Sequence, residues 1–270
     1  MKIAFIGGGN MAAALIGGLI KRGVAPADLY AIDVNEEARA RAHAQFGVAT
    51  AASADESLRH YDAIVLAVKP QVLKAVSAAL APHLSTQLVI SIAAGIRGAD
   101  VSRWLGGYTR VVRAMPNTPA LIGQGVTGLA ALGGVDEAGR SLASQVLGAV
   151  GSSVWFDDEA KIDAVTAISG SGPAYVFYFI EALQEAARRL GLSDDEGRAL
   201  ALGTFAGAAQ LAVQSDESAS VLRERVTSKG GTTAAALAAF DAQGVKEAIV
   251  KGVLAADARA KEMGDELGNQ

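Results

Sequence analysis

The first 23 residues restrict the fold of this chain more than any other stretch. Ile3 to Ile6 form a short apolar run that predicts a buried β-strand. Three consecutive glycines, Gly7-Gly8-Gly9, follow, and the next residues are alanine-rich with apolar side chains at helical spacing. A strand, a glycine turn and a helix, in that order, open a dinucleotide-binding domain. The sequence therefore predicts a Rossmann-type βα unit at the amino terminus.

Each small residue of this turn has its own role in the pattern. Gly7 permits a tight turn, and Gly9 lets the backbone approach a pyrophosphate. Ala12 takes the third position, where a small side chain allows helix and strand to pack closely. The unpaired N–H groups at the helix start would attract the phosphates. Other glycine-rich loops share a GxGxxA pattern, but its place within a complete βα unit favours dinucleotide binding.

The second predicted strand, DLYAID, ends at Asp33. A Rossmann unit places an acidic residue there to accept a hydrogen bond from a ribose 2′-hydroxyl, which favours NAD over NADP. The next residues, NEEARARA, predict a helix, so Asp33 could equally be its N-cap. The sequence leaves both roles open.

The composition excludes several classes of protein. The formal net charge is −4, too small and of the wrong sign for a nucleic-acid-binding chain. The chain has no cysteine, which excludes disulfides, thiolate catalysis and cysteine-ligated zinc, and no metal site is expected. No apolar run is long enough to span a membrane. The first strand begins at once and leaves no room for a signal peptide, so a cytoplasmic protein is expected.

The order of strand and helix signals predicts two domains. Residues 1–157 alternate between them, and the strands are nearly continuous apolar runs, as in a parallel sheet buried on both faces. Residues 158–270 are almost entirely helix-forming. The predicted fold class is α/β, with an N-terminal Rossmann-type doubly wound domain (1–157) and an all-helical C-terminal domain (158–270).

Ligands of a doubly wound sheet bind at the carboxyl ends of its strands. Three such ends are predicted, at Gly7–Met11, Ala67–Pro70 and Ala93–Gly95. Lys69 is the one charged side chain among them, either a cofactor contact or a solvated lysine before a turn proline. Asn117 lies between two prolines in RVVRAMPNTP and predicts a rigid polar turn in the same crevice.

The helical half has two informative stretches. The helix that begins near Pro173 is apolar nearly all round through Ile180, and a small helical domain cannot cover it on every side, so we expect a subunit interface. The loop TSKGGTT brings Thr232 and Thr233 to a helix start, where free N–H groups suit a carboxylate. An ordinary threonine N-cap explains the same pattern.

Six motifs, taken in order, resemble one enzyme family. FIGGGNMA, LAVKPQ, SIAAG, MPNTP, ISGSGPAY and TSKGGTT are arranged as in pyrroline-5-carboxylate reductases, the enzymes of the last step of proline biosynthesis. The resemblance covers essentially the whole chain. Lys229 stands where the family more often has proline, which bears on the rigidity of that loop and not on the assignment.

The resemblance implies a reaction, a cofactor and an assembly. Family members reduce 1-pyrroline-5-carboxylate to L-proline by hydride transfer from NAD(P)H, usually preferring NADPH, with NADH possible. Two subunits interlock through the helical domain, so we expect a homodimer or an assembly of dimers. A preference for NADPH conflicts with the plain interpretation of Asp33, whose carboxylate need not face the ribose.

The resemblance also implies site residues. Thr233 would be the catalytic residue, with its hydroxyl hydrogen-bonded to the ring nitrogen of the substrate. The positions implied to lie near the substrate are Ser228, Gly231, Thr232, Thr233 and, by a looser alignment, Glu159 and Asp216. The positions implied to bind the cofactor are Ile6, Gly7, Gly8, Gly9, Asn10, Met11, Asp33, Ala67, Val68, Lys69, Pro70, Ala93, Ala94 and Gly95.

The residue chemistry agrees with this reaction. No constellation of histidine, cysteine or carboxylate stands out, and a cyclic imine needs little beyond alignment with a hydride donor. Two alternatives remain. Another Rossmann-type imine or β-hydroxyacid reductase is one; the latter need a catalytic lysine, and Lys161 and Lys229 do not lie in a matching pattern. The other is a non-enzymatic NADP-binding regulator.

Overall fold

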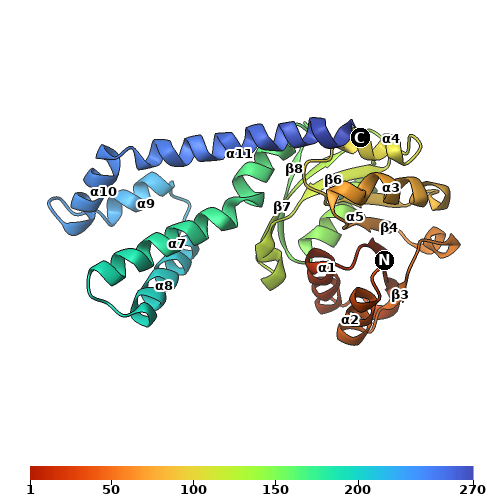
Figure 1. Ribbon diagram of the computed structural model, residues 1–270, viewed down its shortest axis with the longest axis horizontal. Coiled ribbons are helices and arrows are strands. Elements are labelled where there is room, and N and C mark those ends of the chain that lie inside the picture. Colours follow the sequence, from red (N-terminus) through yellow and green to blue (C-terminus); the bar gives the residue numbers. More distant parts are fainter. Residues whose placement is uncertain (270) are drawn as a thin grey trace. The chain divides into compact units, whose positions relative to one another are not determined.

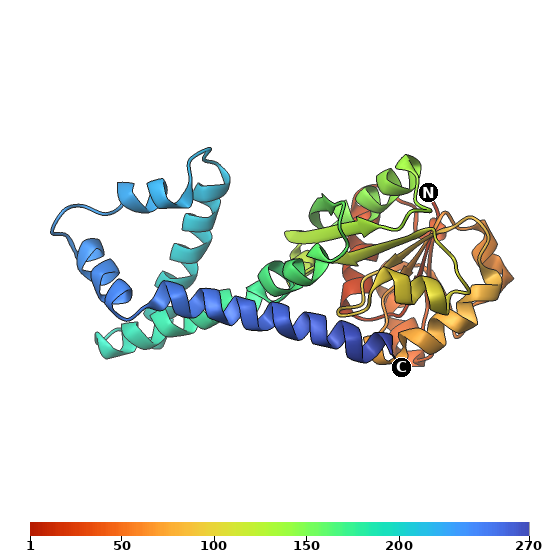
Figure 2. The same ribbon diagram turned by 90° about the horizontal axis from the view of Figure 1, so that it is seen from above.

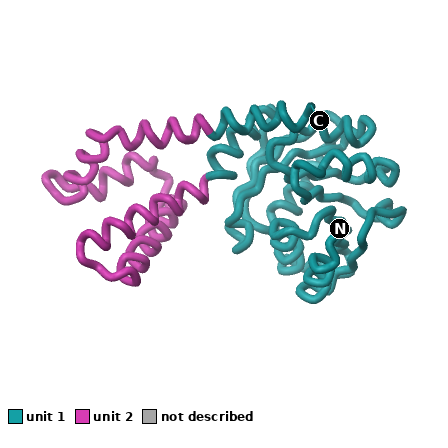
Figure 3. Tube along the Cα trace, viewed as in Figure 1, with its two compact units in different colours: residues 1–171, 256–270 teal, residues 172–255 magenta. Residues whose placement is uncertain are grey.

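The computed structural model describes residues 1–269 (Figure 1, Figure 2). The chain divides into two compact units: unit 1 comprises residues 1–171 and the chain end from Ala256, and unit 2 comprises residues 172–255 (Figure 3). The domain boundary predicted at residues 157/158 lies just after the last strand, which ends at Phe156. It stays a prediction, because the contacts group the residues that follow with the sheet.

Unit 1 is built on an eight-stranded sheet in the order β3-β2-β1-β4-β5-β6-β7-β8. Strands β1 to β6 run parallel, β7 is antiparallel to β6, and β8 is parallel to β7. The order reverses between β1 and β4, the switch point at which such a sheet opens a crevice. The strands are β1 Ile3–Ile6, β2 Leu29–Ile32, β3 Ala49–Ala51, β4 Ala63–Leu66, β5 Leu88–Ser91, β6 Val111–Met115, β7 Gly125–Ala131 and β8 Gly151–Phe156.

Helices lie on both faces of this sheet (Figure 1, Figure 2). Successive side chains of β1 alternate between the faces: Ile3 and Phe5 pack in one apolar cluster, and Ala4 and Ile6 pack in the other. All four are buried, which explains why the strand reads as a continuous apolar run. The helices wholly within unit 1 are α1 Asn10–Lys21, α2 Glu36–Phe46, α3 Pro70–Leu80, α4 Gly98–Trp104, α5 Glu137–Gly148 and α6 Lys161–Val165.

Unit 2 is helical. Its α7 (Gly172–Arg189) leaves Phe177 61% and Tyr178 71% exposed in the single chain, while Ile180 is buried. Large apolar side chains at this exposure agree with the subunit interface expected from the sequence. The remaining helices are α8 Asp194–Val213, α9 Ala219–Arg225, α10 Thr232–Ala242 and α11 Val245–Gly268, whose last part belongs to unit 1.

Candidate functional site

The glycine turn after β1 accepts only glycine at its first position. Gly7 has φ +105°, and a Cβ atom there would lie 2.5 Å from the carbonyl oxygen of Ala67. The Gly7 N–H donates to the carbonyl of Ile32 at 2.7 Å, and the Ala67 N–H donates to that of Ile6 at 2.8 Å. The turn is therefore tied to the carboxyl ends of both neighbouring strands, β2 and β4.

The start of α1 is open to a ligand. Its N-cap is Gly9, no side chain accepts a hydrogen bond from its first turn, and that turn contains no acidic residue. A Cβ atom added at Gly9 would meet no other atom within 4 Å. The first N–H groups of this helix thus have space in front of them and no capping partner, which is what a pyrophosphate requires.

Asp33 is not the N-cap of α2, so the first of its two open roles to be tested, the helix cap, is wrong. Asn35 is the cap, and its side chain accepts from the N–H groups of Glu37 and Ala38. The Asp33 carboxylate instead accepts from the Gly8 N–H at 2.6 Å through Oδ2 and from the Asn35 N–H at 2.8 Å through Oδ1. It therefore fastens the glycine turn to the end of β2. The predicted ribose contact stays a prediction.

An apolar cavity of about 390 Å³ lies beside the glycine turn. Ile6, Val34, Val68 and Val72 are among its lining residues, together with Asp33. These residues come from the ends of β1 and β2, from the segment after β4 and from the start of α3. An adenine dinucleotide has a flat adenine ring next to its phosphates. An apolar cavity beside an open helix start therefore fits such a cofactor.

The other two predicted strand ends lie at the same edge of the sheet, as parallel strands require. Lys69 is exposed and is the N-cap residue of α3, with Pro70 in the first turn and no side-chain capping bond. The loop from Ile92 to Arg97 joins β5 to α4; Ala93 in it is buried, and Gly95 has φ +72°. A Cβ atom at Gly95 would lie 3.1 Å from that of Met263 in the last part of α11.

Glu159 lies in unit 1 and has its own partners there. Its Oε1 accepts from the Gly98 N–H at 2.5 Å and lies 3.4 Å from Nη1 of Arg113. Arg113 is 3% exposed, and its Nη2 donates to Asp163 at 2.6 Å. A contact of Glu159 with substrate stays a prediction. Arg113 and Asp163 escaped the sequence analysis, although an arginine in the apolar run VVRAM must be paired once it is buried.

Asn117 joins two segments of unit 1. Its side-chain oxygen accepts from the Val126 N–H at 2.9 Å, and its Nδ2 lies 3.2 Å from the carbonyl and hydroxyl oxygens of Ser169. Ser169 belongs to a single π-helical turn, Thr166–Gly170, directly before α7. Such turns are frequent at functional sites. The predicted polar turn is thus a tether between β7 and the SGSG motif.

The threonine pair lies in unit 2, at the start of α10. The N-cap is Gly231, and no side chain caps the helix, so the ordinary threonine N-cap is wrong. Thr232 and Thr233 are the first two residues of the helix, and the Gly231 N–H donates to the carbonyl of Ser228 at 3.0 Å. Asp216 is exposed in the same unit. The substrate roles of these residues stay predictions.

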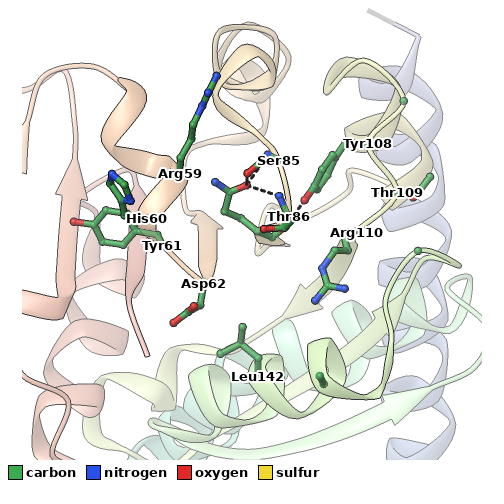
Figure 4. Close-up of a pocket in the computed structure, with 14 residues that line it drawn as sticks. Arg59, His60, Tyr61, Asp62, Ser85, Thr86, Tyr108, Thr109, Arg110 and Leu142 are labelled. Atoms are coloured by element: carbon green, nitrogen blue, oxygen red, sulfur yellow. Dashed lines mark hydrogen bonds between the residues drawn. The ribbon is translucent and has the colours of Figure 1, made fainter.

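A larger cavity, of about 750 Å³, opens at the opposite, amino-terminal ends of β4, β5 and β6 (Figure 4). Its lining is mixed in charge, with Arg59 and Arg110 beside Asp62. The Tyr108 hydroxyl donates to the carbonyl of Gln87 at 2.5 Å. None of the predicted site residues lines it, so cavity size alone does not locate the site in this molecule.

Residues 1–269 contain neither a cluster of metal ligands nor a membrane-spanning helix. No three histidine, cysteine, aspartate or glutamate residues in that range come together as metal ligands would. None of the helices there combines the length and apolar character of a membrane span.

Comparison with known proteins matches both halves of the chain. The model for pyrroline-5-carboxylate reductase dimerisation matches residues 159–263, and a model for coenzyme F420-dependent NADP oxidoreductases matches residues 2–95. The pyrroline-5-carboxylate reductase of Pseudomonas aeruginosa is 48% identical over 99% of this chain and 98% of its own. That of Haemophilus influenzae is 45% identical over 97% of both.

Solved structures agree. A pyrroline-5-carboxylate reductase from Coxiella burnetii superposes with a TM-score of 0.92, at 40% identity over 97% of this chain and 98% of that one. The Plasmodium falciparum enzyme, solved with NADP bound, gives a TM-score of 0.86 at 31% identity over 98% of both chains. With relatives this similar over their full length, the chain belongs to the pyrroline-5-carboxylate reductase family.

Proposed function

We propose that this protein reduces 1-pyrroline-5-carboxylate to L-proline with NAD(P)H. The observation that carries the proposal is the full-length match to reductases of this substrate, joined to an uncapped helix start and an apolar cavity at the switch point of the sheet. The reaction adds a hydride from NAD(P)H to the imine carbon of the protonated substrate, whose ring nitrogen keeps its proton and becomes the secondary amine of proline.

The cofactor supplies the hydride, and the protein supplies binding and alignment. The first N–H groups of α1 would hold the pyrophosphate, and the cavity bordered by Val34 and Val68 would take the adenine. The loop that contains Ala93 and Gly95 would border the nicotinamide. We propose NADPH as the preferred cofactor, supported by the NADP-bound relative, because both oxygens of Asp33 are already engaged by backbone N–H groups.

On the substrate side, the Thr233 hydroxyl would hold the ring nitrogen while the open N–H groups at the start of α10 and Ser228 receive the carboxylate. Holding both ends of the substrate orients its imine carbon for hydride transfer, which is catalysis by proximity. Asp216 would lie at the margin of this site.

The assembly follows from the same family. Residues 159–263 are its dimerisation region, and α7 offers Phe177 and Tyr178 to a partner. The protein acts as a homo-oligomer, and we propose a homodimer or an assembly of dimers. A reaction that consumes NAD(P)H needs an intracellular supply of it, which supports the cytoplasm as the proposed location.

The test is steady-state kinetics of the purified protein with pyrroline-5-carboxylate, using NADPH and NADH side by side. We expect oxidation of the cofactor only when the cyclic imino acid is present, with a higher kcat/KM for NADPH. A β-hydroxyacid serves as the control substrate. Binding of NADPH without any turnover would leave the role of a cofactor-binding regulator and contradict the proposal.

A further inference from the structure

The loop between β5 and α4, residues 92–97, has few hydrogen bonds of its own. Within residues 1–269, the backbone N–H groups of Ala93 to Ile96 donate to no backbone carbonyl. The Ile92 N–H donates to the carbonyl of Leu66 at 3.1 Å, which fixes the first residue of the loop. Burial of Ala93 and Ile96 in the apolar core holds the middle of the loop, and the hydrogen bond at its far end sets where the loop enters α4.

That far end is held by a carboxylate. The Gly98 N–H, directly after the loop, donates to Oε1 of Glu159 at 2.5 Å. A Cβ atom at Gly98 would lie 3.4 Å from each carboxylate oxygen, an ordinary contact, so alanine would fit here without displacing the carboxylate. On the other side, Arg97 pairs with Asp265 at 2.7 Å, but the two side chains are 41% and 66% exposed, and an ion pair in contact with water contributes little.

The Glu159 carboxylate is itself held by a buried arginine of the sheet. Arg113 extends from β6 with only 3% of its side chain exposed and places Nη1 3.4 Å from the same Oε1. Its Nη2 is held by Asp163 at 2.6 Å, and the Asp163 side chain is 7% exposed. A buried guanidinium held between two carboxylates has little freedom, so the position of Glu159 is set by the sheet.

We propose that Glu159 is a positioning residue: through the Gly98 N–H it fixes the loop that borders the nicotinamide and does not itself contact the substrate. This inference rests on the proposed function, because that function assigns the loop to the nicotinamide end of the cofactor. The expected consequence is selective. Loss of Glu159 should weaken binding of the nicotinamide half and leave the adenine half unchanged, since the adenine cavity and the glycine turn lie elsewhere on the sheet.

The experiment compares two ligands by calorimetry on the full-length protein. NADP⁺ contains the nicotinamide, and adenosine 2′,5′-bisphosphate lacks it. For Glu159→Ala we expect NADP⁺ to bind about 10-fold more weakly, as for a lost hydrogen bond to a charged group. The affinity for the bisphosphate should stay within about twofold of the parent. Asp157→Ala removes an exposed carboxylate two residues away and is the matched control.

A second pair of variants approaches the contact from the other side. Gly98→Pro replaces the N–H donor at the first position of α4 by the ring Cδ atom, which also displaces the Glu159 carboxylate. Proline is tolerated at this helix position, and Arg97 already has the extended backbone that a following proline needs. Gly98→Ala adds the Cβ atom but keeps the donor. We expect the proline variant to reproduce the selective loss of NADP⁺ affinity beyond any loss in the alanine variant. The double variant with Glu159→Ala should lose no more than the larger single loss.

The outcomes separate the possibilities. The parent protein must first bind NADP⁺ and reduce pyrroline-5-carboxylate; if it does neither, the proposed function fails. If the parent does both and Glu159→Ala keeps parental NADP⁺ affinity but has a raised KM for pyrroline-5-carboxylate, then Glu159 contacts the substrate and the inference is overturned. Equal losses for NADP⁺ and the bisphosphate would also overturn it. Glu159→Gln, which keeps an oxygen acceptor for Gly98, should recover most of the affinity and guards against a misfolded alanine variant.

Discussion

Replacing Asp33 by alanine tests what this carboxylate does at the cofactor site. The change removes the acceptor of the Gly8 N–H, at 2.6 Å in a partly buried turn, and of the Asn35 N–H, at 2.8 Å. The Asn35 bond is exposed and contributes little, so the loss is set by the Gly8 bond, and a lost hydrogen bond to a charged group costs about 1.5–3 kcal/mol of unfolding free energy. At about 2–4 °C per kcal/mol for a chain of this size, Tm should fall by about 3–12 °C.

The functional effect should be equal for both cofactors. Gly8 belongs to the turn that precedes α1, and NADPH and NADH share the pyrophosphate that this helix start would receive. We therefore expect KM to rise about 10-fold for each, which corresponds to about 1.4 kcal/mol, with their kcat/KM ratio unchanged. The assay is steady-state kinetics with both cofactors on variants checked for folding by circular dichroism.

Asn35→Ala is the matched control. It removes the cap of α2, at a cost of about 0.5–2 kcal/mol, but leaves the bond between Asp33 and Gly8. Its Tm should fall while both KM values stay near those of the parent. A change of about tenfold or more in the ratio of kcat/KM for NADPH and NADH in Asp33→Ala would refute the reasoning, because the carboxylate would then face the ribose.

Three further outcomes are expected. Thr233→Ala should lower kcat about 10- to 100-fold with little change in NADPH affinity, and Thr233→Ser should recover most of it; parental kinetics in the alanine variant would reduce Thr233 to a structural residue. Gly7→Ala should lose at least about 1–3 kcal/mol of unfolding free energy in denaturant melts, since its φ of +105° strains any other residue; an unchanged midpoint would contradict this. Phe177→Asp should give aggregated or unfolded protein, because it places a charge in the proposed subunit interface; a folded monomer by light scattering would rule that interface out.

The sequence predicted the parts of the fold that repeat a simple pattern. Continuous apolar runs identified β1, β4 and β5, and the glycine turn identified the open start of α1. Strand β3, Ala49–Ala51, was missed because three small residues carry no periodic signal. The antiparallel direction of β7 was missed because periodicity does not record direction.

Side-chain partners were harder to predict than elements. Asp33 and Asn35 are both good N-cap residues. Which of them caps α2 depends on the residue at which the helix begins after β2 ends, and local sequence does not determine that residue. The pairing of Glu159 with Arg113 joins residues 46 apart in sequence, and its link to Gly98 spans 61. Contacts of this range depend on the packed sheet, so no local pattern could reveal them.

The course of α11 has a consequence for synthesis of the chain. Its last residues return to unit 1, where the carbonyl of Gly268 accepts from Arg103 at 2.6 Å and Met263 lies against Gly95. Part of the surface of the dinucleotide-binding unit is therefore synthesised only after the whole of unit 2, so this unit is not completed as an independent early domain. A chain that stops after Ala255 would keep all of unit 2 but would expose the apolar residues of unit 1 that Met263 and Leu267 cover.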